Sequence, residues 1–291
     1  MSRPRLLVVA AYAVALAVAL AVGHRVDTEH PLAVAWWADL AGTVAIFAFS
    51  LAFRNSSFYD PYWSVAPFPI AAYWALRPLE VGVNPIRAAV VLALIALWGA
   101  RLTWNWAHGW QGLGHEDWRY ADLKRRTGAA YPLVNFAGIH LAPTVWVFLG
   151  LLPVYVCMTR GLEPFGYTDL LAFAVTFGAI WLEARADAQL RRYRQSNPPA
   201  GEFLRSGLWG WSRHPNYLGE MGFWWGLWLF GVSAVPSAWW WTLAGPVAIT
   251  LMFRFVSLPM IETRMRERRP GYAAWAERSS LVLPRPGRAG G

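Results

Sequence analysis

The residues from Ser206 to Glu220 carry the densest group of polar side chains in the chain, directly before an apolar run. Five hydrogen-bonding side chains fall within eight positions: Arg213, His214, Asn216, Tyr217 and Glu220. Gly219, in the same stretch, allows another backbone or a ligand to approach closely. Because a polar group buried without a partner costs about 1–3 kcal/mol, this density predicts a binding site rather than a structural segment.

A stripe of charges precedes that stretch on a predicted helix. Its members lie at i, i+4, i+8 and i+11, which is one helix face: Glu183, Asp187, Arg191 and Arg194. The stripe fits a ladder of ion pairs on an exposed face. It equally fits a site in which carboxylates hold a ribose and arginines hold phosphates.

Two more charged residues stand at the ends of apolar runs. Asp60 lies between Tyr59 and Pro61, where desolvation at a membrane edge raises a carboxyl pKa and suits proton donation. The same position suits a helix cap, with proline at the first helical position. Arg101 either faces the bundle and pairs with an anion, or extends to the lipid headgroups. Both alternatives stay open for each residue.

The elements that position these residues are apolar runs of membrane-spanning length. Hydrophobic residues make up 56% of the 291 residues and charged residues 15%, against about 25% charged in soluble domains. This composition excludes disorder and disfavours a soluble globule. We predict an all-α polytopic transmembrane bundle of about eight spans. They fall near 6–23, 33–53, 62–77, 87–107, 133–157, 167–184, 219–234 and 238–258. The last two fit separate spans or a re-entrant pair.

The net charge of +9 is explained by topology. With eight spans, 22 of the 26 basic residues fall on one side, and the positive-inside rule makes that side cytoplasmic. We therefore predict an integral inner-membrane or plasma-membrane protein with both termini inside, contacting lipids and no nucleic acid. Residues 1–30 are predicted to form a signal-anchor span, 31–280 a membrane domain and 281–291 a disordered tail. No oligomeric state is indicated.

The segment Ser212-Arg-His-Pro-Asn-Tyr-Leu-Gly-Glu220, preceded by Gly207-Leu-Trp, resembles the steroid 5α-reductase-like membrane reductases. It is most similar to the bacterial branch of unassigned substrate, and the likeness covers about residues 55–280. Isoprenylcysteine carboxyl methyltransferases share an Arg-His-Pro-x-Tyr-x-Gly stretch and a similar basic tail. The motif is therefore specific to a superfamily rather than to one reaction.

The resemblance implies a seven-helix core, with the first span as an addition, that binds NADPH from the cytoplasmic side. It implies reduction of a conjugated C=C bond in a lipophilic substrate, such as a steroid, isoprenoid or fatty-acyl compound. Asn216 and Glu220 would contact the nicotinamide, and Asp60 would polarise a substrate carbonyl. Arg101 matches an arginine of the family and is expected to join Asp60 in catalysis. The expected cofactor-binding set is Glu183, Asp187, Arg191, Arg194, Arg213, His214, Asn216, Tyr217 and Glu220.

Departures from the steroid-reducing members narrow the substrate. Those members have glutamate at the position of Asp60, tyrosine at Trp98 and asparagine at Glu183. The missing tyrosine removes a second donor to a 3-keto group and disfavours a steroid 3-ketone. Aromatic walls are expected from Trp63, Trp98, Trp104, Trp224 and Trp225.

The alternative function is methyl transfer from S-adenosylmethionine. The chain has no Gly-x-Gly-x-x-Gly motif, so a cofactor must be held by side chains at helix ends. S-adenosylmethionine is much less anionic than NADPH, and the surplus of arginines together with Glu220 favours NADPH. No second histidine or cysteine stands at ligand spacing, so no metal site is predicted.

Overall fold

The computed structural model describes residues 3–77 and 82–284, which form helices and loops without strands. The all-α prediction is confirmed. The α-helices are α1 (Arg3–Arg25), α2 (Pro31–Ala52), α3 (Tyr62–Val65), α4 (Pro67–Leu76), α5 (Pro85–Gly109), α6 (Trp118–Thr127), α7 (Tyr131–Val134), α8 (Ala142–Gly150), α9 (Leu152–Thr159), α10 (Tyr167–Gln195), α11 (Leu208–Trp211), α12 (Pro215–Ala234), α13 (Trp239–Thr242), α14 (Ala244–Met252), α15 (Leu258–Arg268) and α16 (Tyr272–Arg278).

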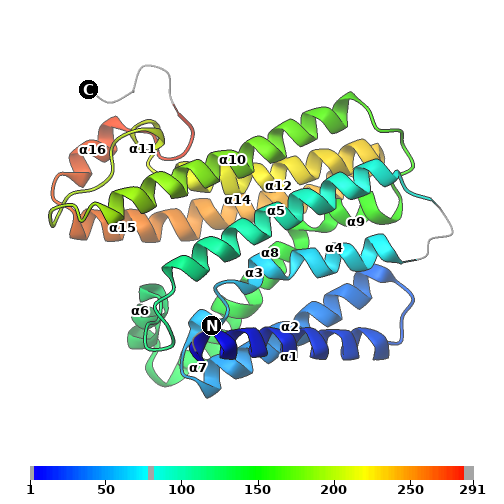
Figure 1. The fold of residues 1–291 in the computed structure, drawn as a ribbon, viewed down its shortest axis with the longest axis horizontal. Coiled ribbons are helices and arrows are strands. Elements are labelled where there is room, and N and C mark those ends of the chain that lie inside the picture. The colour runs from blue at the N-terminus through cyan, green and yellow to red at the C-terminus, as the bar shows by residue number, and fades with distance from the viewer. Residues whose placement is uncertain (1–2, 78–81, 285–291) are drawn as a thin grey trace.

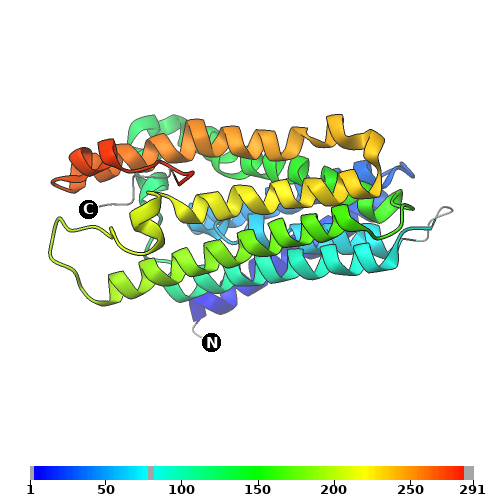
Figure 2. The ribbon, with the colours of Figure 1, turned by 90° about the horizontal axis from the view of Figure 1, so that it is seen from above.

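Six helical bodies in the described ranges are long and apolar enough to cross a membrane, which makes the chain an integral membrane protein. They are Arg3–Arg25, Pro31–Ala52, Pro85–Gly109, Trp118–Gly150, Tyr167–Gln195 and Pro236–Arg268. The other two predicted spans correspond to α3–α4 and to α12. The chain reverses after Ala234, so α12 and the helical body from Pro236 to Arg268 form two long antiparallel helices (Figure 2).

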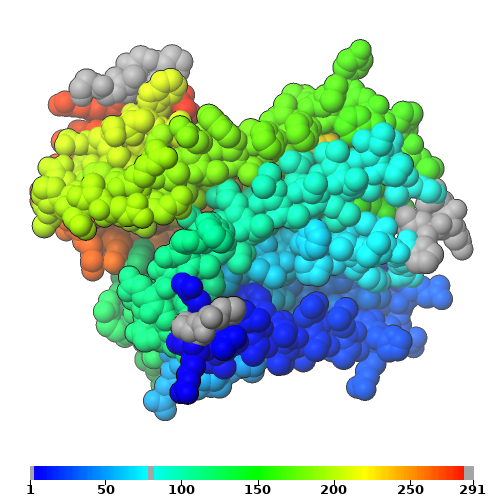
Figure 3. All heavy atoms as spheres, in the orientation of Figure 1, coloured from blue at the N-terminus to red at the C-terminus, as the bar shows by residue number. Residues whose placement is uncertain are grey.

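The long helices run side by side along one axis (Figure 1). The hairpin of α1 and α2 lies on one side, and α5, α10, α12 and α14–α15 lie on the other, with α4, α8 and α9 between them. In the space-filling view, α1, α4, α5 and α10 cover the visible face (Figure 3). Helices α6, α11 and α16 gather toward the end of the bundle where both described chain ends lie.

Proline and side-chain caps set where several helices begin. Pro31, Pro85 and Pro215 occupy the first helical positions of α2, α5 and α12, where the missing N–H is not needed. Asn84 accepts hydrogen bonds from two backbone N–H groups at the start of α5. Asp169 caps α10 in a related way, because its carboxylate accepts from the backbone N–H of Gly166 at 2.9 Å.

Two helices widen into π-helical segments just before a proline. Segment η3 (Asn135–Leu141) ends two residues before Pro143, and segment η5 (Phe253–Ser257) ends two residues before Pro259. Proline removes a backbone donor and crowds the carbonyl four residues earlier, so the preceding turn adopts wider hydrogen bonding. Such irregular backbone is tolerated at membrane depth where it lines a cavity.

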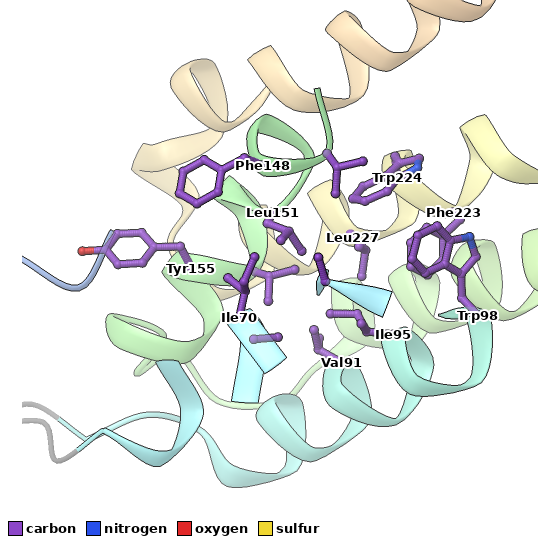
Figure 4. Close-up of a cluster of buried hydrophobic side chains, with 14 of the residues drawn as sticks. Ile70, Val91, Ile95, Trp98, Phe148, Leu151, Tyr155, Phe223, Trp224 and Leu227 are labelled. Atoms are coloured by element: carbon purple, nitrogen blue, oxygen red, sulfur yellow. The ribbon is translucent and has the colours of Figure 1, made fainter. Parts of the chain in front are cut away.

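The hydrophobic core consists of buried aromatic and aliphatic side chains from helices on both sides of the bundle (Figure 4). Trp98 of α5 stacks on Phe223 of α12 with ring centroids 4.5 Å apart and meets Trp224 edge-on. Gly219 lets α12 approach α10, since a Cβ atom there would lie 2.6 Å from the Cβ atom of Glu183. The glycine of the sequence motif therefore brings the carboxylates of two helices together.

A buried ion pair closes the opposite end of the bundle. The guanidinium of Arg87 bonds both carboxylate oxygens of Asp169, at 2.7 and 2.9 Å, and both side chains are fully buried. Arg87 also donates to the carbonyl oxygens of Glu163 and Pro164. The pair ties α5 to the first turn of α10, and the two carbonyl contacts tie α5 to the loop before α10.

An Asp169→Ala variant is expected to lose about 3–5 kcal/mol of stability, because it leaves a buried guanidinium without its counter-ion. Thermal or denaturant unfolding in detergent measures this loss. Glu202→Ala is the control, because the Glu202–Arg205 pair is about half exposed on both sides and contributes less than about 1 kcal/mol. Equal losses for the two variants would contradict a stabilising role for the buried pair.

The first four residues of the predicted tail, 281–284, belong to the described chain. The chain is described through Pro284, and the hydroxyl of Ser212 donates to the carbonyl oxygen of Leu281. Residues 285–291, the remainder of that tail, and residues 1 and 2 lie outside the described residues.

Candidate active site

A cavity of about 1140 Å³ opens toward the end of the bundle where α6 lies. It exceeds the range of about 300–1,000 Å³ that holds most small-molecule ligands. Its walls come from the loop before α3 and from α5, α6, α8, α10, α12 and α14–α15. The sequence-predicted residues on these walls are Asp60, Glu183, Asp187, Asn216, Tyr217 and Glu220.

Three carboxylates gather at the inner wall around one guanidinium. Arg101 Nη2 lies 2.6 Å from Glu183 Oε2, and Arg101 Nη1 donates to Asp187 Oδ2 at 3.0 Å. Asn105 also donates to Asp187 Oδ2, at 3.0 Å. Arg101 therefore faces the bundle rather than the headgroups, and the stripe on α10 pairs across helices instead of forming a ladder along its own face.

Glu220, the third carboxylate, is held by two indoles. Trp98 donates to its Oε2 at 3.0 Å and Trp224 to its Oε1 at 2.8 Å. The carboxylate is only 3% exposed, and its orientation is fixed by donors on α5 and on its own helix. Trp98 is fully buried behind the cavity wall, so its N–H serves Glu220 and is not directed at a ligand.

Apart from Glu183 Oε2, which lies against the Arg101 guanidinium, two buried polar atoms on the cavity wall have no partner within the described residues. They are the amide oxygen of Asn216 on α12 and the indole N–H of Trp106 on α5. One is an acceptor and the other a donor, and an unpaired buried group of either kind is costly. A ligand group that both donates and accepts, such as a primary amide, carries the two kinds of partner that these atoms lack.

Asp60 and Tyr120 form an acid–phenol pair on the cavity wall. The Tyr120 hydroxyl donates to Asp60 Oδ1 at 2.6 Å. Burial raises the pKa of the Asp60 carboxyl to about 6, while the positive charge of Arg119 and the hydrogen bond from Tyr120 act in the opposite direction. Asp60 does not cap a helix, because α3 begins at Tyr62 with Pro61 as the preceding residue and without a side-chain cap.

The loop that carries Asp60 is fastened to the segment that carries Tyr120. Asn55 donates to the carbonyl oxygens of Leu113 and His115. Further along, the backbone N–H of Ser56 donates to Glu116, and that of Asp117 donates to the Ser57 hydroxyl. These bonds keep the two segments in register over 55–60 and 113–120, which sets the phenol against the carboxyl.

The open end of the cavity is basic. Its lining includes five arginines from α6 and α15, against the carboxylates of Asp117, Asp122 and Glu267: Arg119, Arg125, Arg126, Arg264 and Arg268. Three of them pair with acidic residues of the same segment. Arg264 instead stacks over the Trp118 ring at 3.8 Å and so joins α15 to α6. Within the described chain, Arg264 and Arg268 make no ion pair.

Five predicted site residues do not line the cavity: Arg101, which pairs with Glu183 and Asp187, and Arg191, Arg194, Arg213 and His214. Arg213 and His214 both contact Glu262 Oε1, at 3.0 and 2.8 Å. Arg213 also donates to the backbone oxygens of Ala276 in α16 and of Ser279 directly after it. These contacts hold α15 and α16 to the start of α12. Arg191 is exposed and donates to Asn105, while Arg194 is exposed near the C-terminal end of α10.

The aromatic walls differ from the prediction in a similar way. Trp63 and Trp224 line the cavity, Trp98 lies behind it and Trp104 is exposed. Trp225 does not line it either and donates to Thr250.

Helix α6 is the part of the site that sequence reasoning missed. It supplies Tyr120 and three of the five arginines at the mouth. The available signal was the Asp117 N-cap before a short, strongly amphipathic stretch, since Asp117 accepts from the backbone N–H of Arg119. Nothing local in the sequence places that helix over a loop some sixty residues away.

Comparison with known proteins gives the family. The family model described as "Protein of unknown function (DUF1295)" matches residues 46–279. The chain belongs to this family. Family DUF1295 relates in general to steroid 5α-reductase-like proteins, which supports the resemblance at that level. An uncharacterized protein of Schizosaccharomyces pombe is 28% identical over 253 residues, covering 80% of this chain and 73% of the yeast protein. No solved structure matches the chain.

Proposed function

We propose that this DUF1295 protein is a membrane-embedded, NADPH-dependent reductase of a conjugated C=C bond in a lipophilic substrate. The observation that carries the proposal is a single cavity with an acid–phenol pair, an inner set of carboxylates and a basic mouth. A reduction of this kind needs a proton donor, a place for the nicotinamide and a place for the phosphates. We also propose that the mouth faces the cytoplasm, because most basic residues gather at that end.

The residues on the cavity walls fit the dinucleotide in one orientation. The unpaired oxygen of Asn216 and the unpaired N–H of Trp106 suit the carboxamide of nicotinamide. Asp187 suits a ribose hydroxyl, while Arg264 and Arg268 suit the pyrophosphate and 2′-phosphate. The reverse orientation would place phosphates against Glu183, Asp187 and Glu220, which repel them.

The acid–phenol pair would activate the substrate. When bound, NADPH supplies a hydride for the β-carbon of an α,β-unsaturated carbonyl compound. The protonated Asp60 carboxyl, held in place by the Tyr120 hydroxyl, donates to the carbonyl oxygen, draws the electron pair of the double bond toward it and delivers a proton there. The enol returns to the carbonyl form by gaining a proton at the α-carbon and losing one from oxygen. The net consumption is one hydride and one proton.

The inner carboxylates also favour a second candidate. A sulfonium cation would be attracted to Glu183 and Glu220, so S-adenosylmethionine-dependent methyl transfer is the alternative function. S-adenosylmethionine carries no phosphate, so it leaves the arginines of the mouth without a counter-anion. The basic mouth therefore favours NADPH.

Binding of NADPH to the detergent-solubilised protein, followed by its fluorescence, tests the proposal. Replacing Arg264 and Arg268 together by glutamine is expected to raise the NADPH Kd about 10- to 100-fold through loss of phosphate contacts. The matched control changes Arg192 and Arg194 to glutamine, which are exposed on α10 and do not line the cavity.

The control pair is expected to bind NADPH normally, which would remove Arg194 from the predicted site. Tight binding of S-adenosylmethionine without binding of NADPH would overturn the reductase proposal. Equal losses in both arginine pairs would contradict the assigned phosphate position.

A further inference from the structure

One side of the cavity reaches the outer surface of the bundle between two membrane-spanning bodies. The lining residues on this side come from η3–α8 and from α14–η5–α15, and nearly all are apolar: Gly138, Ile139, Pro143, Trp146, Val147, Ile249, Met252, Phe253, Val256 and Met260. Both bodies are long and apolar enough to cross a membrane. In Figure 2, α8 runs behind α14–α15, against which it packs.

Several residues on this side line the cavity and have large exposed fractions. Gly138 is exposed, Val256 is 45% exposed and Met260 is 37% exposed. Their outer neighbours are apolar as well, since Leu133 is 72% exposed and Phe255 is 67% exposed. A surface of this composition on a membrane span contacts lipid acyl chains rather than water.

Both edges of this side are the π-helical segments. Gly138 lies in η3 on one edge, and Val256 lies in η5 on the other. A Cβ atom added at Gly138 would have nothing within 4 Å, so the edge is open there. The π-helical turns lack the regular ridges that let two helices close against each other.

The cavity wall changes from apolar to basic along α14–η5–α15. Ile249, Met252 and Val256 face it first, Met260 follows, and Arg264 and Arg268 face it at the mouth. Tyr120 packs in one cluster with Ile139 of the apolar part, is next in sequence to Arg119 of the mouth, and donates to Asp60. A molecule with a long apolar body and one oxygenated end matches this gradient.

We propose that the cavity opens sideways to the bilayer between η3 and η5 and that the substrate enters through this opening. The substrate is then a membrane-dissolved lipid whose apolar body extends toward the bilayer and whose oxygenated end reaches Asp60. The identification of this molecule as a substrate rests on the proposed function. The opening rests on the cavity and its edges alone.

The test uses the full protein in phosphatidylcholine vesicles and a small apolar aryl diazirine dissolved in the bilayer. After illumination, mass spectrometry measures labelling of two cavity-lining residues that are buried from the outer surface, Trp224 and Ile249. Labelling of Phe177, which is 44% exposed on α10, reports the concentration of probe in the membrane.

A Gly138→Trp variant is expected to reduce labelling of Trp224 and Ile249 at least five-fold and to leave Phe177 unchanged. Gly178→Trp is the matched control, because Gly178 is also an exposed glycine on a spanning helix with nothing within 4 Å of an added Cβ. In Gly178→Trp, labelling of Trp224, Ile249 and Phe177 is expected to equal that in the original chain. If Gly138→Trp does not fold, Val256→Trp narrows the other edge and gives the same readout.

Absence of interior labelling in the original chain, or interior labelling unaffected by both edge variants, would overturn the proposed opening. NADPH binding is measured on the same preparation. Interior labelling without NADPH binding would refute the proposed function and keep the opening, while the reverse result would refute the opening alone.

Discussion

An Asp60→Asn variant is expected to bind NADPH normally and to lose kcat by about 100- to 1,000-fold, the usual contribution of a general acid. The amide keeps the size of the carboxyl group but has no acidic proton to deliver to the carbonyl oxygen. The Tyr120 hydroxyl can still donate to the amide oxygen, so the loop stays in place. The measurement is the rate of NADPH oxidation with a panel of lipophilic α,β-unsaturated carbonyl compounds.

The pH dependence follows from the raised pKa of Asp60. The carboxyl group titrates at about 6, so the proton-donating form dominates below that pH and is lost as the pH rises through it. The rate is expected to fall about ten-fold per pH unit above 6. In Tyr120→Phe, the Asp60 carboxylate loses a stabilising hydrogen bond, so the pKa of Asp60 rises. The break in the pH–rate profile, where the rate begins to fall, therefore shifts to higher pH.

A matched control for these variants is Asp122→Asn. Asp122 also lines the cavity, but its side chain is 32% exposed and pairs with Arg125 and Arg126. We expect the loss in kcat to be much smaller than for Asp60→Asn and the break in the pH profile to stay near 6. An unchanged kcat in Asp60→Asn would remove Asp60 from the mechanism.

Glu220→Gln is expected to weaken the binding of NADP⁺ about 10- to 100-fold more than that of NADPH. The oxidised nicotinamide ring carries a positive charge, and a buried carboxylate attracts it more strongly than a surface carboxylate does. In the variant, an amide NH₂ group replaces one of the two carboxylate oxygens. The indole N–H of either Trp98 or Trp224 therefore faces a donor and loses its acceptor. Kd values for the two nucleotides, measured side by side, give this difference.

The control for that variant is Glu267→Gln. Glu267 lines the mouth of the same cavity but is exposed, so its charge is screened by water. It is expected to change both Kd values equally and by less than about three-fold. An equal effect of Glu220→Gln on NADP⁺ and NADPH would contradict the position assigned to the nicotinamide.

Local sequence patterns were sufficient to predict the membrane-spanning helices. Long apolar runs and prolines at the first helical positions, such as Pro31, Pro85 and Pro215, fix where helices form whatever their neighbours are. The polar residues at the start of α12 were recognised for the same reason. Asn216 and Glu220 lie four residues apart and so share one helix face. A dense polar group at a membrane edge is costly unless it binds a ligand.

Pairing across helices could not be predicted from spacing along one helix. The stripe on α10 suggested that Arg191 and Arg194 accompany Asp187, yet Asp187 pairs with Arg101 of α5. Arg213 stands in the most conspicuous polar stretch, but its partner, Glu262, lies on α15. Ionic partners at such sequence distance are chosen by helix packing, which the i, i+4 rule does not describe.

By itself, the sequence determined that this chain is an all-α membrane protein and that Asp60, Glu183, Asp187, Asn216, Tyr217 and Glu220 are candidates for one site. Only the tertiary structure decided which arginines stand at that site and that Tyr120 belongs to it. Apolar periodicity and charge are properties of each segment and can be read locally. The position of α6 over the loop 55–60 depends on hydrogen bonds between distant segments, which form only after the bundle has assembled.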